Sequence, residues 1–227
     1  MEKIIIEGNK VKFVEEVIKR QIDADQFIAH IEDTVGVNTG ILPRNCLYMK
    51  RENGTSVYVV EVPAGCFPVK YRGDKLFDMV LSFPFTQFYI PMTASGSIGN
   101  IYLTVTKIPV KSVKDTIYIA PYLNIFNKGR GKLCTGNVRV PDTTNNIEKI
   151  NGVINGFYMA ESNLDLNPAI PDCFSNQAKL HYKYYYPEWE EFTKKDKFFA
   201  VSDTVQYTPR NKSIEDMIDI CLGKQTE

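Results

Sequence analysis

The sequence predicts an α+β fold in which an antiparallel β-meander is followed by a long irregular loop and then by helices. Between about residues 41 and 119, six runs rich in β-branched and aromatic residues are separated by turn residues. In residues 57–62, the period of two sets Val57, Val59 and Glu61 against Tyr58, Val60 and Val62. This is typical of a strand in a sheet that is covered on at least one face. After residue 145, apolar residues recur instead at helical spacing. With 44% apolar residues among 227, the chain can form a core of its own.

The first residues predict an N-terminal β-hairpin extension over residues 1–22. Its two short strands are expected at residues 3–7 and 10–18, on either side of a glycine-asparagine turn. A helix is expected next, because an aspartate can cap its start, Gly36 can end it, and apolar residues recur at helical spacing between them. The apolar positions of this predicted helix are Ala24, Phe27, Ile28, Ile31 and Val35.

The predicted meander consists of six strands joined by short turns, so each strand is expected to pair with the next one along the chain. The strands are expected at residues 46–50, 56–62, 67–73, 77–85, 87–92 and 100–108.

Residues 116–145 are rich in Gly, Pro, Asn and Asp and predict a largely irregular segment. A loop of this length in a compact domain usually carries function or is disordered. The helix after it is expected to end near Asn163. Gly152 and Gly156 would give this helix a small-residue face, although each disfavours the helix by about 1 kcal/mol relative to Ala. Its apolar positions are Ile147, Ile150, Ile154, Phe157 and Tyr158.

Residues 166–227 predict an aromatic segment and a terminal helix that pack on the core. The aromatic run at residues 181–192 has two interpretations: a stacking platform for single-stranded nucleic acid, or a part of the core. Glutamates oppose the few lysines nearby, which favours packing against a sheet and argues against nucleic acid as a partner. The terminal helix is expected to be capped by Ser213 together with Asp216 and to stop at Gly223.

The composition excludes several classes of protein. Lys plus Arg and Asp plus Glu both number 27, so no global charge attracts nucleic acid or an anionic membrane. The apolar run near the start is too short for a signal peptide, and no later segment is long enough to span a bilayer, so we expect a cytoplasmic protein with no membrane partner. The five cysteines are widely spaced and expected to be reduced, and the sequence contains no metal-ligand motif, so we expect no disulfide framework, metal or cofactor.

Cys134 is the most informative candidate residue. It follows glycines and the cations Lys128, Arg130 and Lys132, which favour a thiolate, in a segment that is too polar to form core. Neither of the two histidines is near it in sequence, so a Cys-His pair would depend on the fold. By contrast, Cys46, Cys66 and Cys221 stand among apolar neighbours and are expected to be buried and inert. From these neighbouring residues alone, Cys134 can equally be a structural cysteine.

The segment around Cys134 resembles the active-site segment of ubiquitin-conjugating (E2) enzymes. In both, an asparagine, a β-branched residue and an aromatic residue (here residues 124–126) precede a glycine turn, an aliphatic residue and the acceptor cysteine. The chain is more closely similar to the prokaryotic E2-like family D, also called PRTRC system protein B. That resemblance covers roughly residues 36–165, through the runs GILPRNCLYM, VYVVEVPAG, LSFPFTQFYIP and APYLNIF with GKLCTGN.

The resemblance implies an E2/UBC-like fold, with residues 23–165 as the core domain, and an activity. Cys134 would accept a ubiquitin-like protein as a thioester and transfer it to an amine, acting after an E1-like activating enzyme and alongside a JAB-type metalloprotease. Asn124 would correspond to the asparagine of the E2 motif and would hold the loop or donate to the oxyanion. The tail of the modifier would lie against the glycine loop, at Gly129, Arg130, Gly131 and Lys132.

Two departures from the E2 motif leave alternatives open. Tyr122 and Leu123 replace its histidine and proline, and Asn124 and Cys134 are ten positions apart where the motif has eight. One alternative is a non-catalytic E2-like module that binds a ubiquitin-like protein or an assembly partner. Another is a structural protein of a mobile element that shares only the meander. The sequence does not identify a base for the incoming amine; the nearest carboxylates in the chain are those of Asp142 and Asp165.

Overall fold

A computed structural model of the protein describes residues 3–7, 10–14, 18–23, 42–126, 131–136, 138, 140–166 and 168–224. The strands are β1 (Lys3–Glu7), β2 (Lys10–Val14), β3 (Ile18–Asp23), β4 (Cys46–Glu52), β5 (Thr55–Val62), β6 (Gly65–Arg72), β7 (Leu76–Phe83), β8 (Phe85–Thr93), β9 (Tyr102–Thr106), β10 (Tyr118–Ile119), β11 (Ile125–Phe126), β12 (Lys132–Leu133) and β13 (Glu161–Ser162). The helices are α2 (Asn146–Met159), α3 (Asn176–Leu180), η1 (Tyr182–Tyr184), α4 (Tyr185–Lys195), η2 (Phe199–Val201) and α5 (Ile214–Cys221). The α+β class is confirmed.

The six predicted strands of the meander all form, but they do not pair in simple succession. The main sheet has the order β11-β12-β9-β8-β5-β4, with β10 on the side of β9, and its strands are antiparallel. Strand β5 pairs along its whole length with β8, while β6 and β7 form a hairpin in a separate sheet with β13. The predicted pairing of each strand with its successor was therefore wrong for β5 with β6 and for β7 with β8.

Two prolines explain this difference. Pro63 follows the last residue of β5, and Pro84 precedes the first residue of β8. Proline has no backbone N–H and interrupts a ladder of hydrogen bonds, so it is found at strand ends and corners. The chain thus leaves the main sheet at Pro63 and returns at Pro84, and the hairpin between them is an insertion.

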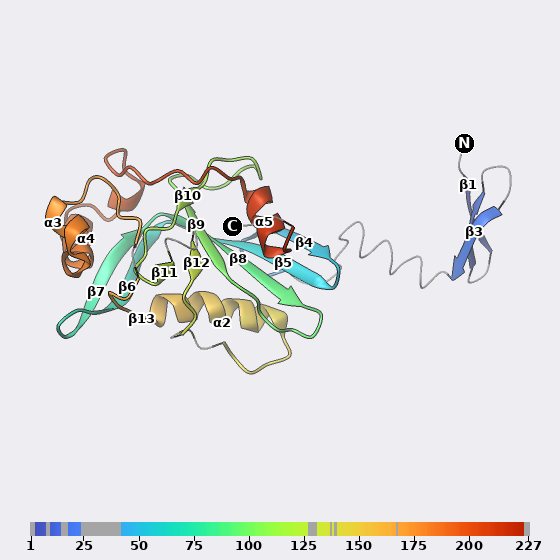
Figure 1. Ribbon diagram of the computed structural model, residues 1–227, viewed down its shortest axis with the longest axis horizontal. Coiled ribbons are helices and arrows are strands. Elements are labelled where there is room, and N and C mark those ends of the chain that lie inside the picture. The colour runs from blue at the N-terminus through green and yellow to red at the C-terminus, as the bar shows by residue number, and fades with distance from the viewer. Residues whose placement is uncertain are drawn as a thin grey trace.

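The main sheet is covered on both faces, as Figure 1 shows with α2 along one side and α5 near the other. Strand β5 shows this arrangement residue by residue, because neighbouring side chains of a strand point to opposite faces of the sheet. Tyr58 and Val60 join the core that includes α2, whereas Val57 and Val59 join the core that includes α5. A strand buried on both faces reads as an almost continuous apolar run.

Near the N-terminus, β1, β2 and β3 form a three-stranded antiparallel sheet. The predicted strand over residues 10–18 corresponds to β2 and to the first residue of β3, and the third strand was not predicted. The helix predicted after residue 23 lies outside the described residues, as do Gly129 and Arg130.

The aromatic run forms η1 and α4 and contributes to the core. Tyr185, Tyr186 and Trp189 are buried, and α4 packs against β7. Pro187 is tolerated because it lies in the first turn of α4, where a backbone N–H has no partner within the helix. The prediction that this run packs against a sheet is confirmed, although its helical form was not predicted.

The two remaining helices follow their sequence signals to different extents. In α5, Ser213 and Asp216 form a capping box and Gly223 has a φ of +73°, as predicted. In contrast, α2 ends at Met159, short of the expected Asn163. The chain becomes extended at Ala160 because the next two residues form β13, which pairs with β6.

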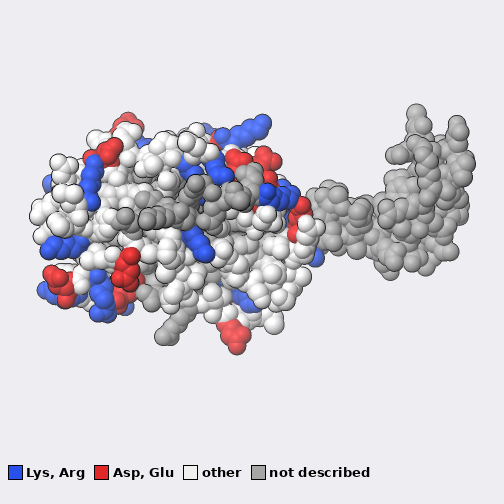
Figure 2. All heavy atoms as spheres, in the orientation of Figure 1, with Lys and Arg blue, Asp and Glu red and all other residues white. Residues whose placement is uncertain are grey.

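Charged side chains of both signs lie side by side on the face seen in Figure 2, so its described residues form no extended area of one charge. This distribution agrees with the equal totals of basic and acidic residues. Within the described parts of the chain, no helix has the length and apolar content that crossing a bilayer would require.

Candidate functional site

Cys134 lies at the base of a short hairpin formed by β11 and β12. We call this the cysteine hairpin and define it as these two strands with the flanking residues Asn124 and Cys134. Ile125 pairs with Leu133, and both side chains are buried in the main core. These two anchors fix the base of the hairpin, and residues 127–130 lie outside the described residues.

The hairpin is joined to the main sheet through β9. The backbone N–H of Leu103 donates to the carbonyl of Gly131 (2.8 Å), and that of Leu133 donates to the carbonyl of Ile101 (2.8 Å). Gly131 is buried and has a φ of +95°, and a Cβ added there would lie 2.6 Å from the carbonyl oxygen of Leu103. Glycine is therefore required at this position by the hairpin's own contact with β9. Four residues were predicted to bind the tail of the modifier. Of these, Gly131 is needed for the contact with β9, and Lys132 is partly exposed, two positions before Cys134.

The structure brings Cys134 and Asn124 together through their backbones. The N–H of Cys134 donates to the carbonyl of Asn124 over 2.9 Å. Cys134 is partly buried, while the next two residues, Thr135 and Gly136, are exposed. The antiparallel pairing of β11 with β12 thus brings the backbones of Asn124 and Cys134 together despite their ten-residue separation.

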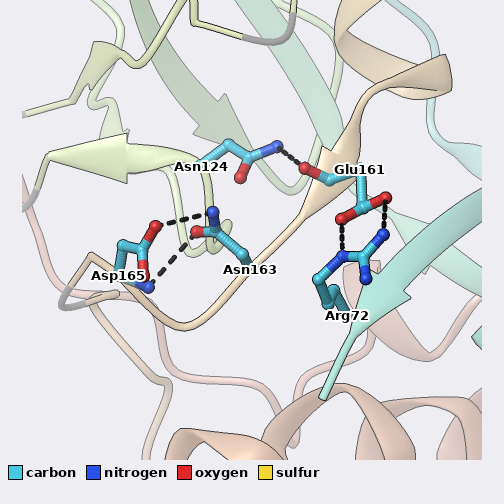
Figure 3. A network of polar contacts seen from close by, with 5 residues as sticks. All are labelled: Arg72, Asn124, Glu161, Asn163 and Asp165. Atoms are coloured by element: carbon cyan, nitrogen blue, oxygen red, sulfur yellow. Dashed lines mark hydrogen bonds and ion pairs between the residues drawn. The ribbon is translucent and has the colours of Figure 1, made fainter. Parts of the chain in front are cut away.

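The side chain of Asn124 holds the hairpin to β13. Its Nδ2 donates to the backbone carbonyl of Glu161 (3.4 Å) and to Oγ of Ser162 (3.3 Å), and the residue is only 7% exposed. Figure 3 shows the amide directed at the Glu161 carbonyl. Of the two roles considered for Asn124, these contacts favour holding the loop over donating to an oxyanion.

Glu161 is itself oriented by Arg72, from the end of β6. The guanidinium binds both carboxylate oxygens, with an Nη2 to Oε2 distance of 2.8 Å and a second contact between Nε and Oε1. Hydrogen bonding to Arg72 and its charge lower the pKa of the Glu161 carboxyl group, so it is a poor acceptor for a proton near neutral pH. No local sequence signal identified Arg72, Glu161 or Ser162, since they meet Asn124 only through the pairing of β13 with β6.

The two carboxylates considered in the sequence lie in different settings. Asp165 is exposed on the loop after β13, where its Oδ2 accepts a hydrogen bond from Asn163 (2.8 Å), and Figure 3 shows both residues with Asn124. Asp142 is also exposed and lies in the segment that follows Cys134. The carboxylate of Asp165 is thus paired with a neighbouring amide and that of Asp142 faces solvent, so neither is assigned as a base.

The segment after Cys134 is held on α2. The N–H of Val138 donates to the carbonyl of Thr135 (3.0 Å), which forms a turn just after the cysteine. Further along, Pro141 packs so closely on Gly152 that a Cβ at position 152 would lie 2.1 Å from its Cδ. The small-residue face predicted for α2 therefore receives a neighbouring segment of the same chain. As a result, the residues on both sides of Cys134 are attached to regular structure.

The prediction that Cys46, Cys66 and Cys221 are buried was wrong for Cys66 and holds only in part for the other two. Cys66 is exposed on β6, so the expectation that it is buried was wrong; strand alternation turns it away from the core that Phe67 joins. Cys46 and Cys221 are partly buried, and burial raises the pKa of the Cys46 thiol. The exposed His181 ends α3, and its ring lies near that of Tyr184. Among the residues that the structure describes, no cluster of three His, Cys, Asp or Glu side chains resembles a metal site.

Comparisons with known protein families, with curated proteins and with solved structures found no match for this chain. The resemblance to the E2-like family therefore depends on the sequence runs quoted above.

Proposed function

We propose that this protein is an E2-like carrier and conjugating enzyme that accepts a ubiquitin-like protein as a thioester on Cys134. The observation that carries the proposal is the cysteine hairpin, in which the Asn124 carbonyl accepts the N–H of Cys134 (2.9 Å). The hairpin presents a partly exposed thiol next to two exposed residues, Thr135 and Gly136. Cys134 is thus partly accessible to another protein's tail while its own backbone is held.

The proposed fold is of the E2/UBC type. In its support, an antiparallel sheet is followed by the cysteine hairpin and then by α2, which lies on one face of the sheet. Residues 23–165 would form the E2-like core, and residues 166–227 would pack on it through α4. Under this proposal, the β6–β7 hairpin is an insertion in the meander.

The proposed chemistry consists of two acyl transfers. First, the Cys134 thiolate attacks the carbonyl carbon of a thioester on an E1-like activating enzyme, and the thiolate of that enzyme leaves as the new thioester forms. Next, an amine attacks the carbonyl carbon of the Cys134 thioester, a proton passes from the amine to solvent, and the Cys134 thiolate leaves as the amide forms. Neither step requires a metal, a nucleotide or an oxidant.

The backbone hydrogen bond of Cys134 supports different roles for the groups around the thiol. Because the Cys134 N–H is bonded to Asn124, donors for the developing oxyanion would come from the following N–H groups, those of Thr135 and Gly136. Asn124 is a positioning residue, since its side chain contacts β13. Cys134 is the catalytic residue.

The proposed partners follow from this chemistry. An E1-like enzyme would supply the ubiquitin-like modifier, and a JAB-type metalloprotease would act in the same system. The modifier's tail would reach Cys134 along Lys132 and the residues Gly129 and Arg130 that precede it in sequence. These partners imply a cytoplasmic setting.

The intact mass of a Cys134→Ser variant, purified from the native host, tests the proposal. Serine would retain the modifier as an oxygen ester, which hydrolyses more slowly than a thioester. We expect a fraction of the variant to carry an added small protein that peptide mapping places at position 134. The matched controls are Cys134→Ala and Cys66→Ser, which alters another accessible cysteine. If the serine variant has only its bare mass while the activating enzyme is present and active, the carrier function is wrong.

The second candidate function is a non-catalytic binding module for a ubiquitin-like protein or an assembly partner. The Asn124 amide favours this candidate, because it donates to Glu161 and Ser162 and so does not serve as a donor to an oxyanion. A Cys134→Ala variant that retains the protein's function in the host would identify a binding module, and an enzyme would lose that function.

A further inference from the structure

The segment before the cysteine hairpin is held by α4, which is more than 60 positions away in sequence. The hydroxyl of Tyr185 donates to the carbonyl of Pro121 (2.9 Å), and the N–H of Leu123 donates to the hydroxyl of Tyr186 (3.2 Å). Both tyrosine side chains are fully buried. A buried backbone group that loses its partner is costly, so these hydroxyls determine the path of residues 121–123.

Tyr186 occupies the more consequential of the two positions. Its hydroxyl accepts the N–H of Leu123, the residue immediately before Asn124 (3.2 Å). The side chain of Asn124 is held separately, by Ser162 on β13 (3.3 Å). The Tyr186 hydroxyl therefore holds the backbone directly before Asn124, while β13 holds the Asn124 side chain.

One further contact connects this network to the thiol. The carbonyl of Asn124 accepts the N–H of Cys134 over 2.9 Å. We infer that Tyr186 is a positioning residue for Cys134, because its hydroxyl fixes the Leu123–Asn124 backbone whose carbonyl holds Cys134. Its importance for thioester chemistry rests on the proposed function, whereas the positioning itself does not.

The protonation state of the hydroxyl is constant under ordinary assay conditions. Burial raises the pKa of Tyr186 to about 12, so the group keeps its proton throughout the neutral range. A change of Cys134 reactivity with pH in that range would therefore report on other groups.

The test compares Tyr186→Phe with Tyr207→Phe. Tyr207 is a suitable control because it is also buried, and its hydroxyl donates to the carbonyl of Ala200 (2.5 Å), outside the network around Asn124. The measurement is the rate at which iodoacetamide alkylates Cys134, divided by the rate at the exposed Cys66 of the same molecule, by peptide mass spectrometry. This ratio corrects for a general loss of stability.

We expect the ratio to rise about fivefold in Tyr186→Phe, the factor that corresponds to about 1 kcal/mol, and to stay unchanged in Tyr207→Phe. Equal ratios in the two variants would overturn the inference. If Tyr186→Phe does not fold, hydrogen exchange of the Leu123 amide in the wild-type protein is the second measurement, and exchange as fast as that of an unprotected amide would overturn the inference.

The assay uses a small reagent and requires neither a modifier nor an activating enzyme. A raised ratio together with an unloaded Cys134→Ser variant would support positioning by Tyr186 and reject the carrier function. A loaded serine variant with an unchanged ratio would support the carrier function and reject the role of Tyr186. The two failures are therefore distinguishable.

Discussion

The terminal helix α5 and the cysteine hairpin are determined in different ways. The start of α5 is set within four residues, since the Ser213 hydroxyl accepts the N–H of Asp216 (3.2 Å) and the Asp216 carboxylate accepts the N–H of Ser213 (2.7 Å). Its end is set by Gly223, which has a positive φ. A Cβ added at Gly223 would have no other atom within 4 Å. The hairpin depends instead on β9, β13 and α4, which lie elsewhere in the sequence.

This difference shows why the two regions should respond differently to mutation. A substitution at either cap of α5 removes a local preference, and its effect should remain small and confined to the helix. A substitution in the hairpin disturbs contacts with several elements at once, so it should lower stability more and also change the reactivity of Cys134. The following predictions test this contrast with the Cys134 to Cys66 alkylation ratio and with urea unfolding.

The largest effect is expected for Gly131→Ala. An alanine Cβ would lie 2.6 Å from the Leu103 carbonyl oxygen, at a φ of +95°. We expect a loss of about 3 kcal/mol in the free energy of unfolding. Gly223→Ala also places alanine at positive φ but in open space, so it should cost about 1 kcal/mol. Equal losses in the two variants would contradict the contrast between the regions.

Gly152→Ala should lower the free energy of unfolding by an intermediate amount, although the same change usually stabilises a helix. In an exposed helix this change stabilises by up to about 1 kcal/mol. Here the new Cβ would meet Pro141 at 2.1 Å, so we expect a net destabilisation of about 1–2 kcal/mol and a changed alkylation ratio.

A double-mutant cycle isolates the contact between Gly152 and Pro141. In a Pro141→Ala background the steric conflict is reduced, so Gly152→Ala should become neutral or stabilising. If Gly152→Ala destabilises both backgrounds equally, the packing of Pro141 on α2 does not explain the effect.

Local signals were sufficient for much of the fold. The strands from residue 46 to residue 106 and the cap of α5 were predicted, because alternation and capping act between near neighbours. The pairing of β5 with β8 was not predicted, since two prolines divide the chain between sheets and no periodicity reveals that division. In general, a pattern along one strand reports which face is buried but not which strand lies next to it.

The candidate site was predicted to a smaller extent. Cys134 and Asn124 were selected in the sequence, and the structure brings their backbones together. Their supports, Tyr186, Ser162 and Glu161, were not, because each is separated from Asn124 by more than 30 positions. Contacts of this kind arise only after the sheets and α4 have packed.

A smaller effect is expected for Ser213→Ala in α5. Loss of the capping hydroxyl leaves the N–H of Asp216 without its side-chain acceptor and should cost about 1 kcal/mol in urea unfolding. Because this contact is local, the alkylation ratio of Cys134 to Cys66 should stay at the wild-type value. A changed ratio would show that α5 and the cysteine hairpin are coupled.

The smallest effect is expected for the ion pair between Glu161 and Arg72, because exposed pairs contribute little. Arg72 lowers the carboxyl pKa in the folded state below the ordinary value of 4.5. The folded protein therefore binds this proton less readily than the unfolded chain does. The stabilisation is thus present above pH 4.5 and disappears as the pH falls through the lowered pKa.

Unfolding of wild type and Glu161→Gln should accordingly differ near neutral pH and converge in acid. Glu191→Gln is the matched control, because Lys194 lowers the pKa of the Glu191 carboxyl group in the same way on the exposed face of α4. Only Glu161→Gln should also change the Cys134 to Cys66 alkylation ratio, since the Glu161 carbonyl accepts from Asn124 and the Glu191 side chain contacts Lys194 instead. If both variants leave that ratio unchanged, Arg72 orients Glu161 without contributing to the hairpin, and the support of Cys134 ends at β13.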